Sequence, residues 1–204
     1  MASVIQVANR ALTKLGSARI TSLSDDVKAA RSISSCFEDI RDDELRAHRW
    51  QFSMKRTTLA ALADAPVFGF TYQYALPPDF LRLDMINDEY PSAVMDNYIG
   101  AETQEYMIEG NVILTDIEAP LKLRYIARIE DPNAWDVNFR EAMASRLAAE
   151  LAEDLTQSDT KKQNAAKDYD RAIRQAVRTN SIERPPARSE EHTSELQSPM
   201  FISY

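Results

Sequence analysis

The chain has 204 residues and a formal net charge of −8 at pH 7, with 32 acidic residues against 24 lysines and arginines. Proteins hold nucleic acid phosphates mainly through clustered lysines and arginines, so we do not expect this acidic chain to wrap DNA tightly. Its single cysteine, Cys36, excludes an internal disulfide and a multi-cysteine zinc site. No apolar run reaches the roughly 18 residues of a membrane span. We therefore expect a protein of the cytoplasm or of a particle, without membrane contact.

Two helices are predicted in the N-terminal part. Apolar residues recur at helical spacing from Val4 to Leu15, and Gly16 follows where a left-handed C-terminal residue is usual. Ser22 to Asp25 offers an S-x-x-D cap for a second helix, which reaches about Ala47. Cys36 falls on the apolar side of that helix, which favours a buried small side chain.

The segment 66–129 changes to strand-like patterns. Aromatic residues alternate with small and polar ones from Phe68 to Tyr74, which predicts a strand with one buried aromatic face. Gly110 and Asn111 predict a hairpin, and the order Gly-Asn favours a type II′ turn. Strands are expected at residues 68–74, 81–86, 105–109, 112–115 and 121–129.

Two further helices follow this segment. A long one is predicted from about Asp136, because apolar residues recur every four positions from Phe139 to Leu155. Ser158 and the acidic residue after it mark the break before the last helix. The expected fold class is therefore α+β: a mainly α-helical bundle of four helices, formed by residues 1–65 and 130–187, with a small antiparallel β-sheet region inserted at 66–129.

Two groups of residues are candidates for partner binding. Trp50 and Phe52 follow the second helix, and aromatic residues often dominate interfaces. The simpler interpretation, which we favour, is that they cap the core of the bundle. Arg171, Arg174 and Arg178 form the most basic local cluster of the chain, for which we favour a solvated helix face.

Catalytic residues are not indicated, and neither is a cofactor or metal site. His48 is the only histidine before residue 188, and its place beside Trp50 favours packing or hydrogen bonding at a helix end. Paired carboxylates can cleave glycosidic bonds, and the pairs to consider are Glu102 with Glu105 and Asp116 with Glu118. In so acidic a chain, carboxylates that are close in the sequence usually belong to a solvated face, which is the interpretation we favour. The four glycines form no phosphate-binding loop.

Residues 11–52 resemble the opening of the head-to-tail adaptor proteins of short-tailed phages, also called tail tubular protein A. The shared elements are a leucine-glycine ending of the first helix, an I-x-S-L connector, and a helix exit with His, Trp and Phe at alternate positions. Here they are Leu15 and Gly16, then Ile20, Ser22 and Leu23, then His48, Trp50 and Phe52. A looser resemblance continues over most of residues 1–187.

The resemblance implies a structural subunit of a ring, typically a dodecamer, between the portal of the phage head and the tail nozzle. Such a subunit is assembled in the bacterial host cytoplasm and belongs to the neck of the virion. DNA passes through the ring without specific binding. Two other classes stay open: a carboxylate-dependent cell-wall hydrolase associated with a tail, and a small non-viral regulatory helical protein.

The end of the chain requires a separate interpretation. Residues 188–198 read RSEEHTSELQS, which is the in-frame translation of a sequencing adapter that begins AGATCGGAAGAGC, and residues 202–204 match a later part of the same adapter. We therefore hypothesise that 188–204 is a non-native tail, and we exclude it from the fold. A disordered polar tail is the alternative. If a native portal-binding end is replaced, docking to the portal should be impaired.

Overall fold

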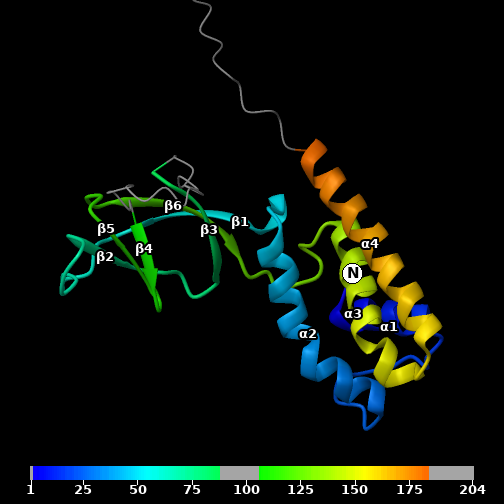
Figure 1. The fold of residues 1–204 in the computed structure, drawn as a ribbon. Helices are drawn as coiled ribbons and strands as arrows, with labels where there is room; N and C mark the ends of the chain where they lie inside the picture. The colour runs from blue at the N-terminus through cyan, green and yellow to red at the C-terminus, as the bar shows by residue number, and fades with distance from the viewer. Residues whose placement is uncertain (1, 88–105, 184–204) are drawn as a thin grey trace, which may run out of the picture.

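The computed structural model describes residues 2–87 and 106–183, and within these ranges it has an α+β fold of helices and antiparallel strands (Figure 1). The helices are α1 (Val4–Leu15), α2 (Lys28–Ala47), α3 (Val137–Thr156) and α4 (Asp159–Ile182). The strands are β1 (Met54–Leu59), β2 (Tyr72–Ala75), β3 (Phe80–Ile86), β4 (Tyr106–Glu109), β5 (Val112–Thr115) and β6 (Leu121–Ala127), and a short 3-10 helix η1 (Gln51–Ser53) precedes β1. The tail 188–204 and the pair Glu102 and Glu105 lie outside the described residues.

Helix α3 is the centre of the helical part, because it packs against α1, α2 and α4. It begins as its sequence predicts: the Asp136 carboxylate accepts a hydrogen bond from the amide of Asn138 at 2.7 Å and caps the helix. Phe139, Met143 and Leu147 are fully buried, so the apolar residues spaced four apart do line the core. None of the helices in the described ranges is long and apolar enough to cross a membrane.

Helix α1 ends at the predicted glycine. Gly16 has a φ of +68°, and the following amide of Ser17 donates to the carbonyl of Leu12 at 2.9 Å. This left-handed ending turns the chain back toward the helix. The connector is then fastened at Ile20, whose amide donates to Asn9 Oδ1 at 2.8 Å and whose carbonyl accepts from Asn9 Nδ2 at 2.9 Å. Ile20 is thereby held in the helical core.

Helix α2 ends at Ala47 as predicted, but the predicted cap at its start is wrong. The helix begins at Lys28 after Val27, which forms no side-chain cap. Asp25 Oδ2 instead accepts hydrogen bonds from the amides of Thr21 at 2.7 Å and Ser22 at 3.1 Å. The S-x-x-D residues therefore close a turn in the loop before the helix, because an aspartate side chain can bond the amides of its own loop in place of a helix end.

The strands form two small antiparallel sheets where the sequence indicated one small sheet region. The first has the order β1-β6-β3 and the second the order β2-β5-β4. The β4-β5 hairpin turns at Gly110, which has a φ of +55°, as predicted. A second core joins the two sheets, and its members include Tyr74, Ile113, Leu121, Leu123 and Tyr125.

The β part begins at Met54, earlier than the boundary at residue 66 that the sequence indicated. Strand β1 pairs with β6 along its whole length, from Met54 opposite Ile126 to Leu59 opposite Leu121. Its sequence, MKRTTL, is mostly polar and lacks a clear apolar alternation, so the pattern did not reveal it. As an edge strand it needs only one neighbour, which β6 supplies.

The aromatic alternation from Phe68 to Tyr74 overstates the length of β2. The strand begins only at Tyr72, and Phe68 is 86% exposed, whereas Tyr74 is fully buried. The loop before the strand is held by Asp116, whose carboxylate accepts hydrogen bonds at 2.8 Å from both the amide and the hydroxyl of Thr71. A single buried aromatic face therefore does not describe the whole segment.

The β part extends to one side of the helices, beside the end of α2 (Figure 1). Leu81 of β3 and Ile126 of β6 belong to the helical core, although most buried residues of these strands belong to the core between the sheets. The sheet β1-β6-β3 therefore connects the two halves of the molecule. The segment 48–53, which leads from α2 into β1, lies in this connecting region.

Candidate functional site at the junction of helices and strands

Trp50 is the centre of the junction. The chain leaves α2 at Ala47 and becomes extended, which carries the indole back under the helix. Trp50 is only 1% exposed, and its Nε1 donates a hydrogen bond to the carbonyl of Glu44 at 2.8 Å. This bond uses one of the carbonyls that the end of a helix leaves without an intrahelical partner.

Aromatic rings surround Trp50 in the helical core. Its ring centroid lies 4.9 Å from that of Phe139 at 66°, and Phe52 contacts the same Phe139 ring at 5.0 Å. Such tilted and edge-to-face pairs are favourable beyond the area they bury. Trp50 is therefore a core residue, as the sequence analysis favoured, and its ring is not accessible to a partner in this fold. Phe52 is half-buried against the same core.

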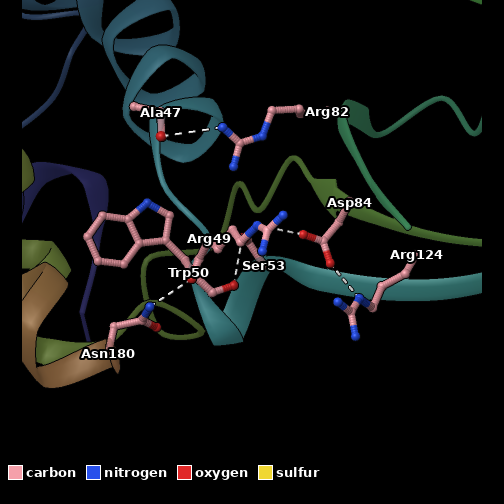
Figure 2. A network of polar contacts seen from close by, with 8 residues as sticks. All are labelled: Ala47, Arg49, Trp50, Ser53, Arg82, Asp84, Arg124 and Asn180. Carbon is pink, nitrogen blue, oxygen red and sulfur yellow. Dashed lines mark hydrogen bonds and ion pairs between the residues drawn. The ribbon is translucent and has the colours of Figure 1, made fainter. Parts of the chain in front are cut away.

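Helix α4 fastens the backbone on both sides of Trp50. Asn180 Oδ1 accepts a hydrogen bond from the amide of Gln51 at 2.9 Å, and Asn180 Nδ2 donates to the carbonyl of Arg49 at 2.7 Å. On the other side, the buried Ser53 hydroxyl donates to the carbonyl of Trp50 at 3.0 Å. Figure 2 shows the contact of Asn180 with Arg49 and that of Ser53 with Trp50 in the segment between α2 and β1.

A buried carboxylate ties this segment to the sheet. Asp84 of β3 is 2% exposed, and it forms ion pairs with Arg49 at 2.8 Å and with Arg124 of β6 at 2.5 Å (Figure 2). Two cations offset the cost of placing one carboxylate out of contact with water. The ion pairs connect the exit of α2 to two neighbouring strands, so they fix how the sheet meets the helices.

Further arginines gather at the end of α2. Arg46 donates to the carbonyl of Leu81 at 2.9 Å, and Arg82 lies 3.4 Å from the carbonyl of Ala47. Both guanidinium groups thus contact backbone across the boundary between α2 and β3. Burial, with the nearby charge of Arg49, lowers the pKa of the Arg82 guanidinium, although that group stays charged near neutral pH.

His48 lies beside this cluster. Its ring meets the Trp50 ring edge-on at 5.4 Å. Burial, and then the positive charge of Arg82, hold the pKa of the His48 imidazole below its ordinary value, so it is neutral near pH 7. A neutral ring packed against an indole agrees with the packing role that the sequence indicated. Within the described ranges no three His, Cys, Asp or Glu side chains are placed to hold a metal ion.

A second buried polar cluster lies one turn of α2 away. The Tyr169 hydroxyl of α4 donates to Glu44 Oε1 at 2.6 Å, and Arg146 Nε of α3 lies 3.6 Å from the same oxygen. Glu44 is 3% exposed, and burial raises the pKa of its carboxyl despite these two partners. Burial and the bond to Glu44 likewise raise the pKa of Tyr169. Side chains from three helices are thereby joined around one carboxylate.

The remaining sequence candidates lie away from the junction. Arg171, Arg174 and Arg178 are all exposed on α4, and Arg171 contacts Asp168 at 3.4 Å. Asp116 holds the loop before β2, as described above, and Glu118 is exposed. Neither acid has the setting of a catalytic carboxylate pair. The structure thus brings Trp50 and Phe52 together and places the three arginines elsewhere.

Sequence reasoning missed Asp84, Asn180 and Glu44. A lone acid within the apolar strand FLRLDMI was a usable signal for Asp84, because a charge on a buried strand needs partners. Nothing local marks Asn180 or Glu44, whose roles depend on contacts between distant segments. Neither a comparison with protein-family models nor a comparison with curated proteins finds a match to this chain.

Proposed function

We propose that this chain is a structural subunit of the ring that joins the portal of a phage head to the tail nozzle. It acts by holding two larger assemblies together and carries out no chemistry. The ring is a dodecamer built on the portal, it leaves a channel through which DNA passes without specific binding, and it is part of the virion neck.

The proposal is supported by the positions that the adaptor-like residues occupy in the fold. Leu15 and Gly16 form the ending of α1, and Ile20 is the connector residue that Asn9 holds in the core. Trp50 and Phe52 lie at the junction of the helices and strands. The sequence elements that resemble the adaptor family are thus the ones that set the angles between parts of the molecule.

The architecture is suited to that task. A packed helical part can associate side by side with its neighbours, and a β part joined to it by buried ion pairs can project from the ring as a rigid unit. A junction fixed by Asp84 and Asn180 would pass force between the two parts without bending. An acidic protein around a channel also repels the phosphate backbone, which allows DNA to slide.

Mixing the chain with the portal protein encoded beside it tests the proposal. Mass measurement by light scattering should show a complex whose added mass corresponds to one ring of subunits per portal. The loop variant Phe68→Ala, which changes an exposed side chain, should form the same complex as the unaltered protein. Absence of a complex with the portal, together with loss of cell-wall polymer in a zymogram, would favour a hydrolase instead.

A further inference from the structure

The helical part carries two exposed faces of opposite charge. The basic face is defined by Lys167, Arg171, Arg174 and Arg178 of α4. These residues are spaced by three or four positions, so their side chains project from the same side of the helix. All four are exposed, in a chain whose overall charge is −8.

The acidic face is defined by Asp39 and Asp43, four positions apart on α2, and by Glu150 of α3, which are all exposed. Helices α2 and α3 pack against each other, and Asp43 lies within 3.9 Å of Arg146 on α3, so the carboxylates of the two helices border the same surface. The pKa of the Cys36 thiol agrees with this placement: burial raises it, and the negative charges of Glu150 and Asp39 raise it further.

The two faces belong to different sides of the bundle. Helices α2 and α4 both pack on α3, and Figure 1 shows them on either side of it. The ion pairs that each face forms within its own copy are long: Arg171 lies 3.4 Å from Asp168, and Asp43 lies 3.9 Å from Arg146. Exposed pairs of this kind contribute little to stability, so both faces can still bind a charged partner.

We propose that the acidic face of one copy binds the basic face of the next copy. Two copies related by a two-fold axis through either face would bring like charges together, which is unfavourable. Contact between two different, complementary faces is heterologous, and repeated heterologous contact closes into a ring when the rotation allows it. This inference rests on the proposed function, because it names the surfaces through which neighbouring subunits of the ring meet.

Charge reversal with mixing tests the proposal. One variant carries Arg171→Glu and Arg174→Glu, and the other carries Asp39→Lys and Asp43→Lys. The first pair of changes cancels the net charge of the basic face, and the second makes the acidic face net positive, so neither variant keeps two complementary faces. Its self-association should therefore weaken by at least about tenfold relative to the wild type. An equimolar mixture pairs the unchanged acidic face of the first variant with the unchanged basic face of the second and should associate again. Sedimentation velocity at high protein concentration and low ionic strength measures the association of the wild type, of each variant and of the mixture.

Two controls accompany this experiment. A variant with Arg19→Glu and Arg56→Glu changes the same charge at exposed arginines outside both faces, and it should associate like the wild type. Raising the salt to about 1 M shortens the screening length to about 3 Å and should dissociate the wild-type protein. Far-UV circular dichroism checks that each variant is folded.

Several results would overturn the inference. They are a wild-type chain that stays monomeric at low salt, reversal variants that associate as the wild type does, and a mixture that does not recover. Loss of duplex DNA binding in the α4 variant, with unchanged self-association, would assign the basic face to nucleic acid instead. A virion ring whose subunits meet through other surfaces would refute this inference but leave the proposed function intact. Charge-dependent association of a chain that is absent from the virion neck would support this inference and refute the proposed function.

Discussion

Asn180 near the end of α4 accepts a hydrogen bond at 2.9 Å from the amide of Gln51, at the start of the segment that leads into β1. These residues lie far apart in the sequence, so one side chain fastens the last helix to the exit of the second. The contact is repeated on the other side of Trp50, where Asn180 donates to the carbonyl of Arg49. The angle between the helical part and the sheets therefore depends on α4.

Replacing Asn180 with alanine should destabilise the fold. The substitution removes both backbone contacts, and because the site is partly exposed we expect a loss of about 1–2 kcal/mol in the free energy of unfolding. Urea unfolding followed by circular dichroism measures this loss. Gln175→Ala on the exposed side of the same helix is the control and should change the value by less than about 0.5 kcal/mol. Equal effects of the two variants would contradict the role of Asn180.

Replacing Asp84 with alanine should have a larger effect. It removes the buried carboxylate that Arg49 and Arg124 both contact, and such a change typically costs about 3–5 kcal/mol. Arg49 is 42% exposed and can be partly solvated, so we expect about 2–3 kcal/mol. The control Asp168→Ala breaks an exposed ion pair and should cost about 0–1 kcal/mol. If both substitutions were equally mild, the ion pairs of Asp84 would not hold the junction.

Replacing Trp50 with alanine separates a core role from a partner-binding role. Removing this buried ring should cost about 3–5 kcal/mol, and Trp50→Phe should cost less because it retains part of the packing. Phe68→Ala removes an aromatic ring that is 86% exposed and should leave stability nearly unchanged. Thermal and urea unfolding compare the three variants. A stable Trp50→Ala variant would show that the ring is not needed for the fold.

Glu44 should make stability depend on pH. Burial raises its folded-state pKa above the ordinary value of 4.5, so its contribution to stability is fully present below the unfolded pKa and is lost as the pH rises through the folded pKa. Glu44→Gln cannot ionise. The stability of the wild type relative to this variant should therefore fall as the pH rises from about 4.5 toward 7. Urea unfolding of both proteins across this range measures the difference.

Glu153→Gln is the control for this dependence. Glu153 is exposed, and its pKa is lowered by the hydrogen bond and charge of Lys162. Its contribution is therefore present above the unfolded pKa and is lost as the pH falls, so the sign is opposite. A wild type that gains stability relative to Glu44→Gln with rising pH would contradict the raised pKa of Glu44.

The features that the sequence predicted correctly are local ones. The glycine ending of α1, the Asp136 start of α3 and the hairpin at Gly110 each depend on a few neighbouring residues. A left-handed glycine or a capping carboxylate forms the same structure almost wherever it occurs. The α+β class followed from the order of such elements along the chain.

The features that the sequence missed depend on contacts between distant segments. Strand β1 exists because β6 pairs with it, and its polar sequence alone does not specify a strand. Asp25 was expected to cap a helix and instead closes the preceding loop. The candidate site likewise combines a local sequence feature with contacts between distant segments. Residues 48–52 could be selected from the sequence, and a lone acid in an apolar strand was a signal for Asp84. Asn180 could not be selected, because its partners lie across the fold.

Electron cryomicroscopy of the phage particle whose genome encodes this chain tests the central claim most directly. We expect a ring of these subunits between the portal and the tail nozzle, with the helical parts side by side. The density should fit the junction of Trp50, Asp84 and Asn180 without a change of angle. A particle in which this polypeptide occupies any other position, or none, would contradict the account.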